Sequence, residues 1–332
     1  MSNAALRRRW STPDGAMLAA QAAAFLSQGG DTRGAELFGT FQGRIDLRGL
    51  TFEDPFVAPR LDGRGRTTGV TDDFVELDGV HLANIDLSHS RLRSFRFFGV
   101  AIENCVFDQA DCTDWRMWNT HVRDSSFLGA KMRGSALAAL AEPGPVAETA
   151  LPLWTGVCFD GADLRDTSMS AGAVNSCTFE RSKLDRATFE NVSISDCRFT
   201  GSIKRAEFFG YPRGGSGPRC RPMTRVDFSE AHFVDVTFRG CRFVDVQFPE
   251  DQRLLIVEDI HSLAPLALPL LAGDSLEERI ARALIENVGP PDPSDSTAVF
   301  EAVGEDDPAF DLIAQVLERA RTASRDEHYP LE

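Results

Sequence analysis

The sequence predicts an elongated, mainly β repeat protein, a solenoid with helices at its two ends. An apolar residue recurs at every fifth position over most of the chain, and a small or β-branched residue often stands two places before it. A period of five fits neither the 3.6-residue period of a helix nor the two-residue period of a strand. Helix start and stop signals occur in the first and last parts of the chain. Internal self-similarity at a fixed period is typical of repeat architectures.

The apolar positions of the repeat fall into separate runs. The first long run holds Leu77, Leu82, Leu87, Leu92, Phe97, Ile102, Phe107, Cys112, Met117, Val122, Phe127, Met132 and Leu137. The second holds Trp154, Phe159, Leu164, Met169, Val174, Phe179, Leu184, Phe189, Ile194 and Phe199 and, after one dropped residue, Ile203 and Phe208. The last holds Phe228, Phe233, Phe238, Phe243 and Phe248, and Ile45/Leu47 with Leu50/Phe52 form an isolated first pair. Residues 53–74, 138–153 and 209–225 are expected to leave the repeat as excursions.

Individual units carry a recognisable consensus. Residues 162–166 read Ala-Asp-Leu-Arg-Asp and residues 187–191 read Ala-Thr-Phe-Glu-Asn. Both resemble the A(D/N)LXX unit of the pentapeptide-repeat family, and the resemblance extends over about residues 45–52, 75–137 and 154–248. It implies a right-handed quadrilateral β-helix, in which each pentapeptide forms one side and four units complete a turn. The central Leu or Phe and the small residue two places before it would point inward.

A turn of four units predicts that residues 20 apart stack in columns. The expected columns include Phe159–Phe179–Phe199, Phe107–Phe127 and Cys177–Cys197. Outward charges at the same spacing are opposite in sign, at Asp163/Lys183, Arg165/Asp185 and Asp166/Arg186. Stacked coils are about 4.8 Å apart, so these pairs should form neighbouring rungs.

The expected organisation has three parts. Residues 1–44 form an N-terminal cap whose helix starts at Thr12–Pro13 and ends at Gly29–Gly30. Residues 45–248 form the β-helix with its three excursions. Residues 249–332 form an acidic, mostly helical extension, since a solenoid needs its two open ends covered.

Two helices are expected in the extension. Ser275 to Glu278 reads as a capping box that opens a helix to about Glu286. A second helix starts at Asp307–Pro308 and runs to about Arg325, and Pro290–Pro293 forms a linker between the two. The apolar face of the second helix consists of Phe310, Ile313, Val316, Leu317 and Ala320. This face could dock on the β-helix or on a second copy, so a homodimer through the C-terminal helices stays open.

The negative charge is concentrated in the extension. The whole chain has a formal net charge of −15, yet residues 1–248 hold 29 Lys and Arg against 31 Asp and Glu. Residues 249–332 hold 6 basic and 19 acidic side chains, a net charge of −13. The predicted β-helix is therefore close to neutral.

A search for catalytic or metal-binding motifs finds none that is specific. No HExxH, Walker or GxSxG pattern occurs. The inward thiols Cys105, Cys112, Cys177, Cys197 and Cys241 are expected to be core residues; Cys158 and Cys220 are the two that could react. We predict a protein that is not an enzyme and has no cofactor or metal. The absence of an 18-residue apolar run argues against a transmembrane helix, and a cytoplasmic protein is expected.

Two surface features depart from the pattern. Phe98 and Trp118 occupy outward positions 20 apart, with Arg96 and Arg116 beside them and the oversized Phe95 and Trp115 at small-residue positions. They indicate either a widened or covered coil or a protein-binding patch, since aromatic residues and Arg are enriched in interface hot spots. The second feature is a candidate basic loop in the excursion 209–225, either independently solvated or paired with the acidic extension. Its residues are Arg213, Arg219, Arg221 and Arg225.

These observations favour a non-catalytic protein-binding scaffold or adaptor whose partner the sequence does not identify. The family resemblance implies an alternative, because some pentapeptide-repeat proteins mimic double-stranded DNA, bind DNA gyrase and protect it from inhibitors. A nearly neutral β-helix disfavours that alternative. Four Arg residues are also too small a basic footprint to predict direct nucleic-acid binding, and no membrane partner is expected.

Overall fold

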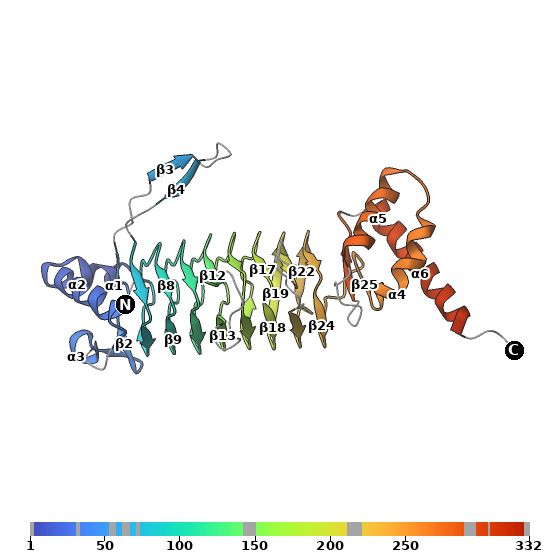
Figure 1. Cartoon of the computed structure of the whole chain (residues 1–332). Coiled ribbons are helices and arrows are strands. Elements are labelled where there is room, and N and C mark those ends of the chain that lie inside the picture. Colours follow the sequence, from blue (N-terminus) through green and yellow to red (C-terminus); the bar gives the residue numbers. More distant parts are fainter. Residues whose placement is uncertain are drawn as a thin grey trace.

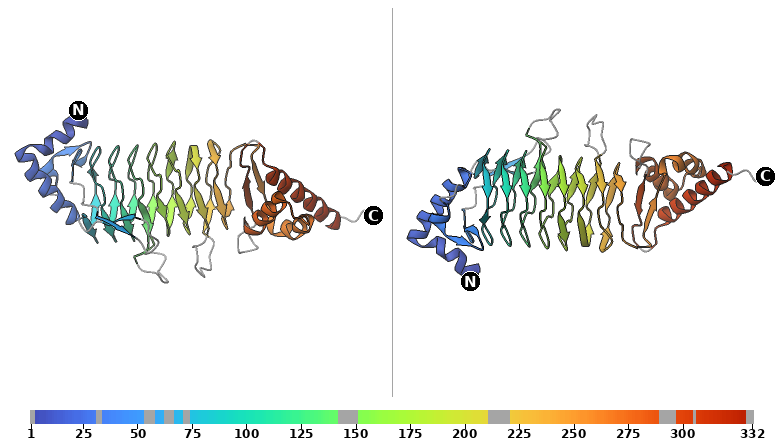
Figure 2. Two further views of the ribbon diagram at one scale, coloured as in Figure 1. Left: turned by 90° about the horizontal axis from the view of Figure 1, so that it is seen from above. Right: turned by 90° about the horizontal axis from the view of Figure 1, so that it is seen from below.

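The computed structural model describes residues 3–30, 34–52, 58–61, 67–70, 74–141, 151–210, 221–288, 297–304 and 306–328. The chain forms a straight rod of stacked coils with helices at both ends (Figure 1). The N-terminal helices cover the first coil, and the C-terminal helices follow the last coil. Both further views show the same arrangement (Figure 2).

Two sides of the rod are continuous parallel sheets of eight strands each. The first contains, in spatial order, β5 (Glu76–Asp78), β8 (Arg96–Phe98), β10 (Arg116–Trp118), β12 (Ala136–Ala139), β14 (Ser168–Met169), β17 (Thr188–Glu190), β20 (Glu207–Phe209) and β23 (Thr237–Arg239). The second contains β6 (His81–Ala83), β9 (Ala101–Glu103), β11 (His121–Arg123), β13 (Leu153–Thr155), β15 (Ala173–Asn175), β18 (Ser193–Ser195), β21 (Pro222–Thr224) and β24 (Arg242–Val244).

Shorter pairings complete the other two sides. They comprise β7 (Ile85–Asp86), which pairs with β2 (Arg44–Asp46), and the sheet of β16 (Thr178–Glu180), β19 (Arg198–Lys204) and β22 (Ala231–Val234). Single parallel bridges link the remaining coils, for example between Asp111 and Lys131. With four ladders running along one axis, the predicted four-sided β-helix is confirmed.

The core consists of columns of identical positions from successive coils. Phe159 and Phe179 stack with ring centroids 4.9 Å apart, and Phe179 and Phe199 stack at 4.4 Å. Phe107 and Phe127 stack at 4.7 Å, and the backbone N–H of Cys177 donates to the sulfur of Cys197. The columns expected from 20-residue spacing are therefore confirmed. Aromatic pairs in such geometry contribute beyond the area that they bury.

The corners explain why the outward positions of each unit are polar or glycine. Many corner residues have positive φ, including Asn84 (56°), Asp166 (58°) and Asp196 (54°). Asn, Asp and Gly adopt this left-handed conformation at lower cost than other residues. The turn positions of the repeat therefore follow from backbone conformation.

Three features depart from the regular 20-residue turn. At the dropped residue, Phe189 pairs with Phe208 only 19 positions later, and β19 continues as one strand around a corner. Gly201 takes φ +81° there, where a Cβ atom would lie 3.2 Å from the Cα of Arg181. The excursion predicted at 209–225 ends earlier than expected. Met223 lies in β21 and is buried in the core, although the predicted runs of apolar residues do not include it. The excursion at 53–74 contains an antiparallel hairpin of β3 (Ala58–Leu61) and β4 (Thr67–Val70), which projects from the rod (Figure 1).

Helices and one short strand cover the first coil. They are α1 (Asn3–Arg8), the 3₁₀ helix η1 (Arg9–Ser11), α2 (Pro13–Ser27), α3 (Gly34–Phe38) and β1 (Thr40–Phe41), which pairs with β2. Thr12 caps α2 by accepting from the N–H of Gly15 at 3.0 Å, as the Thr-Pro start signal predicts. Phe25 and Leu26 are buried and belong to the core of the β-helix. The N-terminal helices thus extend the apolar core beyond the first coil.

An ion-pair cluster fastens this cap to the coil. Asp46 accepts from Arg9 at 3.0 Å and from Arg48 at 2.9 Å. Burial opposes ionisation of this carboxyl, but the hydrogen bonds from the two guanidinium groups outweigh it and lower the pKa of Asp46 from 3.8 to about 2. A depressed pKa means that the carboxylate stabilises the fold above about pH 4 and loses this contribution as pH falls through about 2.

Asp46→Asn is therefore expected to lower the free energy of unfolding by about 1 kcal/mol at pH 7, with the deficit shrinking towards pH 2. Denaturant unfolding of wild type and variant at pH 7 and at pH 2.5 measures this difference. Substitution of the exposed Asp78 by Asn serves as the control. A deficit of the same size at both pH values would contradict the assignment.

The C-terminal part forms its own small core behind the last coil. It contains β25 (Leu254–Val257), α4 (Ile260–Ala267), the 3₁₀ helix η3 (Leu268–Leu270), α5 (Leu276–Val288), β26 (Ala298–Glu301) and α6 (Pro308–His328). Both predicted helices are present, and the capping box forms, since the N–H of Glu278 donates to the Ser275 hydroxyl at 3.1 Å. Helix α4 and the antiparallel β25–β26 pair were not expected, and the linker Pro290–Pro293 lies outside the described residues.

The predicted apolar face of α6 packs inside this C-terminal core. Ile313, Val316, Leu317 and Ala320 are buried, and Phe310 packs against them. Their neighbours are apolar residues of α4 and α5, including Leu263, Ala281 and Ile285. The face therefore belongs to a three-helix unit of the same chain.

Candidate protein-interaction surfaces

Two aromatic side chains stack on the outside of the rod. Phe98 ends β8 and Trp118 ends β10, and their backbones pair in parallel register. The ring centroids are 4.6 Å apart and the planes differ by 7°. Both side chains are half-buried. The expected outward stack is confirmed in its geometry, and it presents ring surface to solvent across two successive coils.

The large residues beside this pair fill the core. Phe95 and Trp115 are 2% and 0% exposed. The Trp115 ring lies 4.7 Å from that of Phe97 and edge-on to Phe107 at 5.4 Å, and its indole N–H donates to the carbonyl of Leu92. Trp115 therefore has both the packing and the hydrogen bond that a buried tryptophan needs.

The two arginines beside the aromatic pair share one carboxylate. Arg96 contacts Asp114 at 3.1 Å and Arg116 contacts it at 2.7 Å. Burial lowers the pKa of Arg116, which Asp114 partly offsets. The Arg96 guanidinium also lies 5.1 Å from the ring centroid of Phe74, a cation–π contact. Phe74, which is 38% exposed, joins Phe98, Trp118, Arg96 and Arg116 in what we call the aromatic patch.

The candidate basic loop is only partly within the described residues. Arg213 and Arg219 lie outside them. The N–H of Arg221 donates to the carbonyl of Gly210 at 2.8 Å, which joins the two ends of the excursion. Arg225 stands at a coil corner with φ 51° and forms a double hydrogen bond with Asp196 at 2.6 and 2.8 Å. Its charge is thus compensated within the rod.

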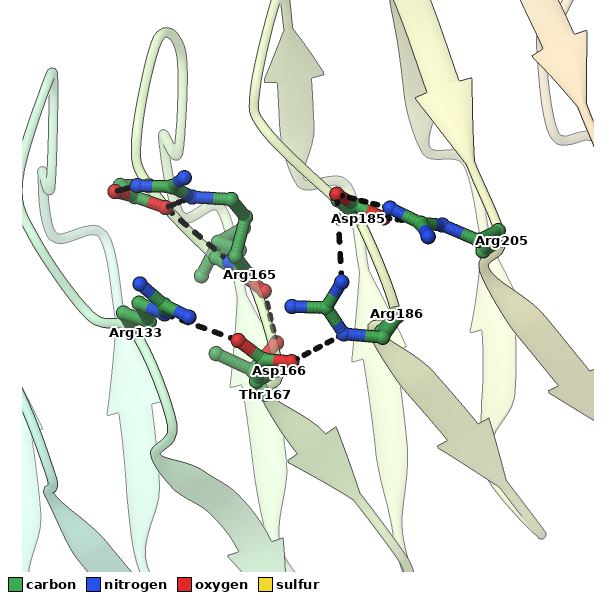
Figure 3. A network of polar contacts seen from close by, with 9 residues as sticks. Arg133, Arg165, Asp166, Thr167, Asp185, Arg186 and Arg205 are labelled. Carbon is green, nitrogen blue, oxygen red and sulfur yellow. Dashed lines mark hydrogen bonds and ion pairs between the residues drawn. The ribbon is translucent and has the colours of Figure 1, made fainter.

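Charges on one outer edge of the rod compensate one another in a chain of ion pairs (Figure 3). Asp166 accepts from Arg133 at 3.0 Å and from Arg186 at 2.6 Å. Arg186 also lies 3.7 Å from Asp185, which accepts from Arg205 at 2.8 Å. The network runs across four successive coils and alternates in sign.

The predicted charge rungs form in part. Asp166 and Arg186 make the expected ion pair. The prediction that Arg165 pairs with Asp185 is wrong, because Arg165 turns back to Asp163, two residues earlier, at 2.6 Å. This pairing also occupies the Asp163 carboxylate. Lys183 attracts that carboxylate at longer range, and a β-bridge joins the backbones of Asp163 and Lys183. A guanidinium on a flexible stem reaches its nearest carboxylate across the corner.

Four of the described cysteines have raised thiol pKa values. Burial raises the pKa of Cys105 to about 12 and raises those of Cys112 and Cys158. The hydrogen bond with Cys197, together with burial, raises the pKa of Cys177. The thiolate is the reactive form, so these shifts suppress nucleophilic reactivity. Cys220 lies outside the described residues.

Within the described ranges, no three His, Cys, Asp or Glu side chains are grouped so that they could hold a metal ion. Among the same residues, no helix is both long enough and apolar enough to cross a membrane.

One carboxylate of the C-terminal unit caps a corner of the last coil. In earlier coils the N–H at one corner donates to a carbonyl of the next coil, as Arg205 does to Val234 at 2.8 Å. The equivalent corner in the last coil is Asp235. Its N–H and that of Val236 both donate to the Glu301 carboxylate, each at 2.8 Å. The Glu301 side chain of β26 thus supplies to Asp235 the acceptor that a further coil would have provided.

A groove lies at the junction between the last coil and the C-terminal unit, and no sequence pattern predicts it. It has a volume of about 280 Å³. One wall is β23 and its corner, the second is β26 with Val303, and the third is α5, which contributes Ile280 and Leu284. Ile280 and Leu284 are 42% and 41% exposed and Val303 is 77% exposed. The groove depends on the β25–β26 pairing, which has no periodic signal in the sequence.

Comparison with known proteins finds similarity at the level of structure. No family model matches the sequence, and no curated protein matches it. A trypsin-treated form of QnrB1, a plasmid-mediated fluoroquinolone resistance protein, is 11% identical with a TM-score of 0.34, and the match covers 50% of this chain and 75% of that one.

Two cyanobacterial proteins are similar in the same way. HetL from Nostoc, a pentapeptide repeat protein involved in heterocyst differentiation regulation, is 15% identical with a TM-score of 0.26, over 51% of this chain and 81% of its own. The pentapeptide repeat protein Rfr23 from Cyanothece is 16% identical with a TM-score of 0.14, over 33% of this chain and 71% of its own. At these identities the likeness concerns the fold alone.

Stacked coils with five-residue sides define the class of quadrilateral β-helices. With its recurrent five-residue unit and its stacked four-sided coils, the chain has this fold.

Proposed function

We propose that this protein is a non-catalytic scaffold that binds another protein through its outer surface. The observation that carries the proposal is the stack of Phe98 on Trp118 outside the core. Large aromatic rings held rigidly on a sheet lose little conformational entropy on binding and are enriched in interface hot spots. Arg96 and Arg116, fixed by Asp114, supply the polar edge of such a surface.

The outer charges support this proposal over DNA mimicry. A DNA-like surface needs a continuous row of negative charge, because duplex DNA carries one charge per about 1.7 Å of its axis. Along the rod, Asp166 and Asp185 are each bound by arginines of neighbouring coils. Their charge is therefore compensated before any partner arrives.

The double variant Phe98→Ala/Trp118→Ala is expected to lose its partner. In a pull-down from cells that contain the protein, with the full chain as bait, recovery of the specific partner should fall at least tenfold, since hot-spot side chains contribute about 2 kcal/mol or more each. Recovery is measured by quantitative mass spectrometry.

The matched control is Ser168→Ala/Thr188→Ala, which changes two outward positions 20 apart on the same sheet. Circular dichroism and thermal unfolding confirm that both double variants are folded. Equal recovery of the partner by the two double variants would refute the role of the patch.

A further inference from the structure

The groove at the junction combines an apolar floor with a negative rim. Its floor and walls include Val236, Phe238, Val299 and Phe300, which are buried. Ile280, Leu284 and Val303 extend the apolar surface to its exposed lip. A volume of about 280 Å³ is just below the range for small-molecule pockets, about 300–1,000 Å³. It suits the anchoring side chains of a larger partner.

The apolar surface on α5 continues past the groove. Leu276, Ile280 and Leu284 are spaced by four residues, so they lie in one stripe along the helix, and all three are exposed, at 64%, 42% and 41%. The opposite side of α5, with Ala281 and Ile285, is buried in the C-terminal core. An exposed apolar stripe beside a groove is the surface that an amphipathic helix covers in helix-in-groove recognition.

The charges at the groove favour a basic partner. Three carboxylates line it, those of Asp235, Glu301 and Asp307, against one guanidinium, that of Arg253. Arg253 is already bound by Asp251 at 2.6 Å. The surrounding segment 249–332 has a net charge of −13, so the field around the groove attracts cations and repels a second acidic copy of this segment.

We infer that the junction groove binds a basic amphipathic helical segment of a partner protein. Aliphatic side chains on one face of that segment enter the groove beside Ile280 and Leu284, and lysine or arginine side chains on its edges face Asp235 and Asp307. This surface is separate from the aromatic patch and does not depend on it.

The test uses the full-length protein and a fluorescent synthetic peptide of about 15 residues, with leucines at helical spacing and lysines elsewhere. Fluorescence anisotropy at physiological ionic strength should show saturable binding. A peptide with the same leucines and glutamate in place of lysine should bind at least tenfold more weakly. The Phe98→Ala/Trp118→Ala variant should bind the basic peptide as wild type does, so failure of this inference and failure of the aromatic patch give different results.

The deciding comparison uses Ile280→Glu/Leu284→Glu against Met17→Glu/Leu128→Glu. Each pair adds two negative charges at exposed apolar positions, since Met17 and Leu128 are 64% and 46% exposed. If the peptide binds in the groove, Ile280→Glu/Leu284→Glu should bind it at least tenfold more weakly than wild type does, although its two added carboxylates attract the basic peptide more strongly. The second pair should bind at least as tightly as wild type.

Three results would overturn the inference. The first is that both variants bind the peptide equally, which would mean charge attraction alone. The second is that wild type does not bind it. The third is that wild type sediments as a dimer that Ile280→Glu/Leu284→Glu converts to a monomer, which would make a second copy the occupant.

Discussion

Replacement of Phe179 by alanine should lower the free energy of unfolding by about 3–5 kcal/mol, the range for deletion of a buried aromatic ring. The side chain is 1% exposed and its ring lies between those of Phe159 and Phe199, at 4.9 and 4.4 Å. Coils above and below are held by backbone hydrogen bonds, so they cannot approach each other to fill the space left by the ring. Chemical denaturation of wild type and variant measures the loss.

The location of the damage is a second part of this prediction. Each coil contacts only its neighbours, so destabilisation in a solenoid spreads to adjacent units first. Amide hydrogen exchange should accelerate in residues 159–199 and stay unchanged in the N-terminal helix α2. Phe179→Leu should cost less than about 1.5 kcal/mol, and Leu128→Ala, at an exposed position, less than about 0.5 kcal/mol. A loss below 1 kcal/mol for Phe179→Ala would contradict the rigid stacking of the coils.

Glu301→Ala should loosen the contact between the C-terminal unit and the rod, at a cost of about 2 kcal/mol. The carboxylate accepts from two backbone N–H groups, of Asp235 and Val236, and each hydrogen bond to a charged group contributes about 1.5–3 kcal/mol before exposure to water reduces it. Glu301→Gln should lose less, because its amide keeps one oxygen acceptor. Amide hydrogen exchange at Asp235 and Val236 measures the change directly.

The control for this experiment is Glu318→Ala on α6, a glutamate that is 65% exposed and paired with Arg321. Its removal should leave the exchange of Asp235 and Val236 unaffected. Unchanged exchange of these two amides in Glu301→Ala would show that water satisfies them as well as the carboxylate does.

The repeat was predictable because one local rule is applied many times. The position of Phe179 in its column follows from counting 20 residues, and errors in a single unit are corrected by its neighbours. The same counting placed Phe98 on Trp118. It failed for Arg165, since the rotamers of a long side chain, and not the coil spacing, decide which carboxylate it reaches.

The junction could not be predicted in this way. Strands β25 and β26 are four residues each and are separated by a helix-containing segment, so no period links them. The role of Glu301 depends on that pairing, because only β26 brings its carboxylate to the last corner. The groove likewise forms between elements that are far apart in the sequence and share no common pattern. The helices that flank it were predictable, because they carry clear capping signals.

The parallel sheet through β10 and β23 fixes a distance. The two strands are five intervals apart in the sheet order, which corresponds to about 24 Å at 4.8 Å per interval. The aromatic patch on β8 and β10 and the groove at β23 are thus held at a set spacing on a rigid rod. A partner that occupied both would make its second contact as an intramolecular step, with an effective concentration set by how well its own two elements match that spacing. Insertion or removal of one four-unit coil would change the spacing by about 4.8 Å, so the number of repeats acts as a length standard for any bivalent ligand.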